Sequence, residues 1–309
     1  MNKDWQSALA PAGPDAAIIH QFTWVMSAAA LLILAGVLTL LALAVYRGPR
    51  PVNAVRWIAG LGIAFPTVVL TLLLGWSTWR SAQLTPQSSR DAMVISVTAK
   101  MWWWEVRYRD PAGGPDIIAA NEIHIPTGRA VYLSLSSNDV IHSMWIPALA
   151  GKMDMLPGRP TGLTLRADKP GVYRGQCAEY CGTQHARMAL HVVAQPQAGF
   201  DAWLQRQRQP AAAPTSAMLI RGRDAFIGQR CGACHTIRGV QDDARLGPDL
   251  THVGSRSHIG AGTLRNHRGT LAGWIADPQA SKPGVAMPPA GEIDGDTLRA
   301  LAAYLEHLK

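Results

Sequence analysis

Two long apolar stretches near the start of the chain contrast with the mixed pattern that follows them. Residues 22–46 and 57–79 contain no charged side chain, and each exceeds the roughly 20 residues that a helix needs to cross a bilayer core. Tryptophan and tyrosine lie at their ends, as in the aromatic belts of membrane helices. The pattern predicts a two-helix transmembrane hairpin over residues 22–80. Residues 1–21 lack the apolar core of a signal peptide and are expected to form a short outward-facing tail.

The short connection between the two stretches carries Arg47, Arg50 and Arg56 and no acidic residue. Cytoplasmic loops of membrane proteins are enriched in basic residues. The charge pattern therefore places this connection in the cytoplasm and both ends of the chain on the outer face.

Composition limits the class of the protein. Hydrophobic residues make up 48% of the 309 residues and charged residues 16%, against about 25% charged in soluble domains, so the chain is not disordered and part of it is expected in lipid. The net charge of +8 is spread along the chain without a basic block, which argues against nucleic-acid binding. This length leaves room for two or three domains.

After residue 80 the pattern changes to short β-rich runs separated by Gly, Pro, Asn and Asp. The runs span residues 93–99, 102–108, 117–125, 130–136, 161–166, 172–177 and 188–193. Short strands with turn residues between them are typical of an all-β sandwich or Greek-key barrel. A helix over residues 200–209 is expected to close this domain, which we assign to residues 81–209.

The segment between the last two predicted strands concentrates soft metal ligands. Cys177, Cys181, His185 and Met188 lie close together in it. Thiolate, imidazole and thioether groups together favour copper, and two cysteines on one loop can bridge two metal ions. The alternatives are a disulfide beside a core histidine, or a zinc site, for which Met188 would be a poor ligand.

A second histidine ligand has to come from elsewhere in this domain, which offers His124, His142 and His191. His124 and His191 lie in alternating strand patterns and are interpreted as ordinary residues of the β domain. His142 follows a strand at its exit into a loop, where functional residues are commonly placed. We therefore predict His142 as the second imidazole.

A second redox module follows a linker. Residues 210–217 are rich in alanine and proline, which is typical of a semi-rigid spacer, and residues 218–309 have helical periodicity. Cys231-Gly-Ala-Cys234-His235 is the attachment pattern of a c-type haem, in which both thiols bond the haem and the histidine binds its iron. A thioredoxin-like pair would lack the adjacent histidine and lie in a βαβ pattern.

The sixth iron ligand follows from counting. Met287 is the only methionine after His235, and it is followed by two prolines that stiffen its loop. Histidine and methionine together suit a high-potential electron carrier. A bis-histidine haem that uses His252, His258 or His267 is the alternative.

These motifs resemble subunit II of cytochrome c oxidase. The CxExCGxxHxxM loop at residues 177–188, the DVIHS segment around His142 and the Trp102-Trp103-Trp104-Glu105 run carry the likeness, together with the paired helices, over residues 1 to about 205. The resemblance implies a cupredoxin fold that holds the dinuclear copper centre CuA. The ligands that it implies are His142, Cys177, Glu179 through its backbone carbonyl, Cys181, His185 and Met188. It also implies a magnesium ion on the Glu179 carboxylate at the interface with subunit I, and Trp102 as the residue where electrons enter.

The C-terminal region resembles a class I cytochrome c, in which the helix carrying Gly222 and Phe226 crosses the last helix at Leu301 and Tyr304. The expected fold is thus a multi-domain membrane protein with a transmembrane hairpin, an all-β cupredoxin domain and an all-α cytochrome c domain, as in caa-type oxidases.

The resemblance implies a function. Cytochrome c or a bc-type complex would reduce the haem, CuA would receive the electron, and subunit I, with other oxidase subunits, would reduce oxygen to water and translocate protons. The expected location is the bacterial inner membrane, with both redox domains on the periplasmic face. The alternative is the CuA subunit of a nitric oxide reductase of the same superfamily. A copper chaperone would lack the CxExCGxxHxxM loop, and a quinol oxidase subunit would lack the cysteines.

Overall fold

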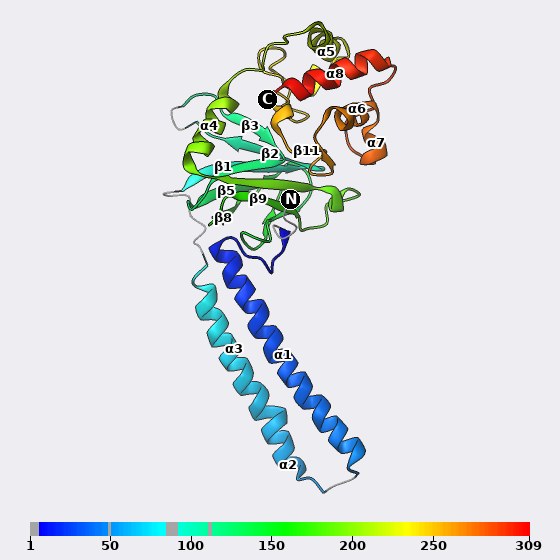
Figure 1. Cartoon of the computed structure of the whole chain (residues 1–309). Coiled ribbons are helices and arrows are strands. Elements are labelled where there is room, and N and C mark those ends of the chain that lie inside the picture. The colour runs from blue at the N-terminus through cyan, green and yellow to red at the C-terminus, as the bar shows by residue number, and fades with distance from the viewer. Residues whose placement is uncertain (1–5, 49–50, 85–91, 111–112) are drawn as a thin grey trace.

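The computed structural model describes residues 6–48, 51–84, 92–110 and 113–309 (Figure 1). It has three parts: a helical hairpin, a β sandwich, and a small helical domain on the side of the sandwich away from the hairpin. Arg50, which contributes to the predicted cytoplasmic connection, lies outside the described residues.

The hairpin consists of two helical segments that run side by side (Figure 1). The first is α1 (Pro14–Tyr46), and the second is formed by α2 (Ala54–Trp57), a π-helical stretch (Ile58–Ala64) and α3 (Phe65–Ser81). By length and composition both can cross a membrane, with hydropathies of 2.7 and 2.1. The π-helical stretch ends just before Pro66, whose ring nitrogen has no N–H to continue regular α-helical bonding.

The start of α1 is attached to the β sandwich. Ala12 N donates to Ala148 O at 2.7 Å, and Asp168 N donates to Ala12 O at 2.8 Å. Ala16 and Ile18 on the first turns of α1 are buried. The part of the predicted tail that the structure describes therefore packs on the sandwich, and its last residues are already helical.

The sandwich has two five-stranded sheets, with strand orders β3-β2-β1-β5-β8 and β4-β10-β9-β6-β7. The strands are β1 (Met93–Lys100), β2 (Trp103–Tyr108), β3 (Ile117–Ala120), β4 (Glu122–Pro126), β5 (Val131–Ser137), β6 (His142–Trp145), β7 (Met153–Met155), β8 (Thr161–Leu165), β9 (Gly171–Cys177) and β10 (Ala189–Gln195). β1 pairs with β5 and β4 with β10 in parallel, and the other pairs are antiparallel. Side chains alternate between buried and partly exposed along β1, β2 and β5, and the buried ones form one apolar core with buried residues of the other sheet.

Two details differ from the strands that the sequence predicts. The single strand predicted over residues 117–125 divides at Asn121, which has a φ of 62° and lets the chain pass from one sheet to the other. The side-chain oxygen of Asn121 accepts a hydrogen bond from Trp104 N at 2.9 Å. This bond satisfies the Trp104 N–H at the point where the chain passes between the sheets. The short strands β6 and β7 were not expected from the sequence.

The helical domain follows α4 (Gln197–Arg208) and the linker. It contains α5 (Ala217–Gly228), α6 (Arg268–Ala276), α7 (Pro278–Ser281) and α8 (Gly295–His307), and a small hairpin of β11 (His258–Ile259) and β12 (Leu264–Arg265). A Cβ at Gly222 would lie 2.1 Å from Ala300 O and 2.7 Å from Tyr304 Cβ. The predicted close crossing of α5 and α8 at this glycine is confirmed.

Candidate metal and haem sites

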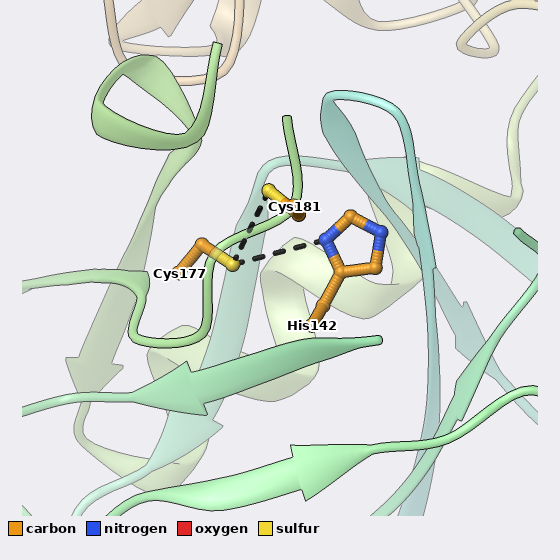
Figure 2. A group of neighbouring side chains, drawn as sticks. All are labelled: His142, Cys177 and Cys181. Carbon is orange, nitrogen blue, oxygen red and sulfur yellow. Dashed lines mark hydrogen bonds between the residues drawn. The ribbon is translucent and has the colours of Figure 1, made fainter. Parts of the chain in front are cut away.

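A buried group of sulfur and nitrogen atoms lies between β6 and the loop that joins β9 to β10. His142 Nδ1 is 3.7 Å from Cys177 Sγ, which is 3.7 Å from Cys181 Sγ (Figure 2). The ligand atoms of these three residues all lie within 4.8 Å of one another. Both cysteines are free and buried, so their thiols point at one another without a disulfide.

The other three predicted ligands surround the same pair of thiols. His185 Nδ1 is 3.7 Å and Met188 Sδ is 3.9 Å from Cys181 Sγ, and Glu179 O is 3.2 Å from Cys177 Sγ. All six residues expected as ligands therefore lie around the pair of thiols, His142 and Glu179 O beside Cys177, and His185 and Met188 beside Cys181. The donor set consists of two thiols, two imidazoles, one thioether and one carbonyl, which fits copper in a dinuclear thiolate centre.

The two thiols influence each other's ionisation. The hydrogen bond with Cys181 lowers the pKa of Cys177, and the same contact raises the pKa of Cys181. One proton is thus easily lost from the pair, while the second is retained in the absence of a cation. Metal ions bind to cysteine as thiolate, so a cation would replace that proton.

Asp139 orients the first imidazole. Its Oδ1 is 2.8 Å from His142 Nε2, which directs Nδ1 toward Cys177, and such outer carboxylates raise the basicity of a ligand histidine. His142 is the first residue of β6, so the prediction that it lies at a strand's exit into a loop is corrected. His124 stacks on Trp203 and His191 on His258, away from the thiols.

Glu179 presents two different groups. Its backbone carbonyl faces Cys177, while its carboxylate, 41% exposed, lies 3.5 Å from Lys152 Nζ. The carboxylate is thus accessible from outside the sandwich, on the same loop as the thiols.

A cavity of about 520 Å³ lies between the helical domain and the β sandwich. Cys231, Cys234, His235 and Met287, the four residues predicted to hold haem, all line it. Most of its other walls are apolar, from residues such as Phe226, Leu250, Ile275 and Leu301, which suits a flat hydrophobic macrocycle. The residues present therefore fit a covalently attached haem.

The orientation of His235 agrees with iron binding. Its Nδ1 lies 2.8 Å from Pro248 O, to which an N–H at this position donates, and this leaves Nε2 for a metal. Gly247 permits this arrangement, because a Cβ there would lie 2.5 Å from the ring. Burial lowers the pKa of His235 and favours the neutral form that binds a metal.

The histidines considered as alternatives to Met287 have other contacts. His252 Nε2 is 3.1 Å from Gln209 O, and His267 caps the N-terminus of α6. His258 lines the cavity but stacks on His191. These contacts favour Met287 over the three histidines as the second iron ligand.

Trp102 lies between the two sites. Its Nε1 donates to Cys181 O at 2.8 Å, its ring is close to Gly182 and Gly284, and the residue lines the haem cavity. Its own carbonyl accepts from Lys282 Nζ at 2.7 Å. Sequence reasoning missed Lys282, because a lysine in a polar loop is normally exposed and no local pattern reports its burial.

Two protein-family models match the chain. Residues 115–195 match "Cytochrome C oxidase subunit II, periplasmic domain", and residues 219–309 match "Cytochrome c". The first match implies CuA copper in the sandwich and the second implies haem in the helical domain. A solved structure of the periplasmic domain of subunit II of cytochrome oxidase from Bradyrhizobium japonicum is 27% identical, with a TM-score of 0.37, and covers 40% of this chain and 97% of that chain.

Curated relatives extend the likeness over most of the chain. Cytochrome c oxidase subunit 2 of Alkalihalophilus pseudofirmus is 35% identical over 247 residues, which is 80% of this chain and 69% of the relative. The same subunit of Bacillus sp. strain PS3 is 32% identical over 257 residues, which is 80% of this chain and 70% of the relative. The chain therefore belongs to the cytochrome c oxidase subunit 2 family, as a member with a fused cytochrome c domain, and is an oxidoreductase component of a haem-copper oxidase.

Proposed function

We propose that this chain is the subunit through which electrons enter a terminal cytochrome c oxidase. An external carrier would reduce the haem held by the cytochrome c domain, the electron would cross near Trp102 to the CuA centre held by the sandwich, and it would continue to subunit I, where oxygen would be reduced to water. The observation that carries this proposal is the position of Trp102, which hydrogen-bonds to Cys181 and lines the haem cavity.

The residues around each centre have defined tasks in this proposal. His142, Cys177, Glu179 O, Cys181, His185 and Met188 would bind copper; Cys231, Cys234, His235 and Met287 would hold haem. When bound, copper and haem iron each supply a one-electron carrier. Asp139 and Pro248 O orient one imidazole at each centre, and the apolar cavity walls exclude water.

Magnesium is the third proposed cofactor. The exposed Glu179 carboxylate lies on the copper loop, and oxygen ligands suit Mg²⁺. We place this ion at the interface with subunit I, where the remaining ligands would come from the partner. Because the Glu179 carbonyl faces Cys177, one residue would contact both metal centres.

The membrane anchor sets the proposed location. Members of this family work beside subunit I, and the two apolar helices fit a membrane-anchored protein. We place both redox domains on the periplasmic face of a bacterial inner membrane, where cytochrome c or a bc-type complex delivers electrons. The arginines of the hairpin connection, of which the structure describes Arg47 and Arg56, support this orientation.

The path can be tested by substituting Trp102 in the full-length protein. Trp102→Phe removes the Nε1–H that donates to Cys181 O, and Trp102→Ala also removes the ring. Electron transfer after flash reduction of the haem is followed at the CuA absorption band. Relative to the wild type, haem-to-copper transfer should be slower in Trp102→Phe and at least tenfold slower in Trp102→Ala, with unchanged copper spectra. Trp103→Ala, which alters the same cavity wall, is the matched control. Wild-type transfer in Trp102→Ala would refute the path.

The acceptor requires a separate test. The purified membrane complex should consume oxygen with reduced cytochrome c as donor. Consumption of nitric oxide in place of oxygen would identify the chain as the CuA subunit of a nitric oxide reductase.

A further inference from the structure

Three consecutive residues of the cytochrome c domain hydrogen-bond to the β domain. Gln184 Nε2 donates to Pro283 O at 2.7 Å, Arg187 Nη1 donates to Ser281 O at 2.5 Å, and Lys282 Nζ donates to Trp102 O at 2.7 Å. The 281–283 segment is thus bonded to the other domain at every residue.

The contacts of this segment join the two proposed centres. Gln184 and Arg187 belong to the loop that carries the predicted copper ligands, between Cys181 and Met188. On the other side, the 281–283 segment leads directly into the loop with Met287, the predicted haem ligand. A shift of this segment would therefore change the position of the haem loop relative to the copper loop.

Lys282 has the most unusual environment of the three residues. Its side chain is 2% exposed, and Nζ also donates to Gly260 O at 3.1 Å. Among the residues that the structure describes, no carboxylate pairs with it. Lysine is almost never fully buried without such a partner, because an unpaired charge loses its hydration. The burial of Lys282 despite this desolvation cost indicates that its side chain has a structural role, which is to hold the segments that it hydrogen-bonds in place.

Both protonation states of this lysine can perform that task. The pKa of Lys282 is lowered to about 7, mainly by burial, with Arg187 acting in the same direction and Cys181 opposing it. The neutral amine still has two N–H groups and the ammonium has three, and two carbonyls accept from them. The contact therefore does not depend on the charge of the lysine.

We propose that Lys282 is a positioning residue for electron transfer between the two domains: it holds the Met287 loop against the main chain of Trp102 and fixes the docked arrangement from which the electron crosses. This inference rests on the proposed function. The observed transfer rate is the rate in the docked state multiplied by the docked fraction, so loss of the contact lowers the rate while both centres stay intact. The linker keeps the local concentration of the cytochrome c domain high, so docking is weakened but not abolished.

The experiment uses the full-length protein with copper and haem. Lys282→Met keeps the length of the side chain but removes its donors, and Lys282→Gln keeps an N–H₂ group without the charge. Lys169→Met, at an exposed lysine of the β domain, is the matched control. We expect haem-to-copper transfer to fall at least tenfold in Lys282→Met, less in Lys282→Gln and not at all in Lys169→Met, with unchanged spectra and metal content.

Hydrogen exchange provides a readout that is independent of electron transfer. Ala189 N donates to Ala261 O at 2.9 Å, and Ser257 N donates to Glu122 Oε1 at 2.7 Å, both across the domain boundary. These two amides should exchange at least tenfold faster in Lys282→Met and at the wild-type rate in Lys169→Met. If Lys282→Met does not accumulate, Lys282→Gln is used for both measurements.

The outcomes separate this inference from the proposed path. Wild-type transfer in Lys282→Met, or slowed transfer with unchanged exchange at Ala189 and Ser257, would overturn the positioning role. Wild-type transfer in Trp102→Ala together with slow transfer in Lys282→Met would overturn only the path through Trp102. Slow transfer in Trp102→Ala together with wild-type transfer in Lys282→Met would overturn only the role of Lys282.

Discussion

His191 of the β domain and His258 of the cytochrome c domain stack across the boundary between the domains, with ring centroids 4.4 Å apart and planes at 17°. The pKa of His191 is lowered to about 4, mainly by burial, with His258 and Arg174 acting in the same direction and Glu122 opposing them. The stack therefore holds His191 neutral at pH values where a free histidine is protonated.

We predict that acid weakens the docking of the two domains between pH 6.5 and about 4. The pKa of His191 is lower in the docked state than the ordinary 6.5, so the undocked state binds more protons in this window. The stabilisation is complete above pH 6.5 and is lost as the pH falls through the window, by on the order of 2 kcal/mol. Although burial raises the pKa of Glu122, hydrogen bonds from His124 and Ser257 lower it to about 2, so its contact with Ser257 persists.

Hydrogen exchange at Ser257, measured against pH, checks this prediction. His191→Phe keeps an aromatic ring in the stack but cannot take up a proton at this position. Exchange in this variant, corrected for intrinsic rates, should therefore depend less on pH than in the wild type. Burial also lowers the pKa of His258, which accounts for the dependence that remains. A wild-type profile that matches that of His191→Phe would show that His191 has no part in docking.

The donor set predicts two coppers and one covalent haem per chain. Each pair of cysteines has its own complete set of neighbours, one around Cys177 and Cys181 and one around the haem cavity. Elemental analysis of the purified protein should give a copper-to-haem ratio of two. Cys181→Ser should lose most of its copper and keep its haem. A single copper per haem, or zinc, would contradict the dinuclear assignment.

Met287→Leu should leave haem attached, since both thiols and His235 are unaffected. Loss of the thioether should lower the reduction potential by on the order of 100 mV, a fraction of the roughly 0.8 V range that axial ligands set. The sixth position should then bind carbon monoxide in the reduced protein. Redox titration and absorption spectra provide the measurement, and an unchanged potential would indicate a histidine ligand.

Gly222→Ala should destabilise the cytochrome c domain by about 1–3 kcal/mol, because its Cβ would lie 2.1 Å from Ala300 O and the helices would have to separate. Gly273→Ala on α6 is the matched control, since nothing lies within 4 Å of a Cβ there, and it should be neutral or stabilising. Urea unfolding followed by haem absorbance compares them. Equal midpoints would show that α5 and α8 tolerate a wider separation.

The ligand clusters could be predicted from sequence because most of their members are close together along the chain. Cys177, Cys181, His185 and Met188 lie on one loop, so their spacing alone brings them together. The fold was less accessible where the signal was short or misleading. β6 and β7 are too short to show alternation, and the β-rich run over residues 117–125 continues through Asn121, where the chain changes sheets.

Contacts between the domains could not be predicted in this way. Lys282, Gln184 and Arg187 are ordinary polar residues in loops, and their roles arise only when two separately folded parts meet. No periodicity or spacing encodes such a meeting, because it depends on the shapes of both surfaces.

The attachment of Ala12 to Ala148 and Asp168 determines how freely the sandwich can turn. A domain attached at one point by a flexible segment can rotate in any direction about that point. A second attachment leaves only rotation about the line that joins the two attachment points. The sandwich is joined to the hairpin through the residues at the start of α1 as well as through the chain after α3, so the rotation of the sandwich and its copper loop relative to the helices is restricted. The cytochrome c domain has a single covalent connection to the rest of the chain. Its position relative to the copper loop therefore depends on the contacts across the domain boundary, such as that of Lys282 with Trp102.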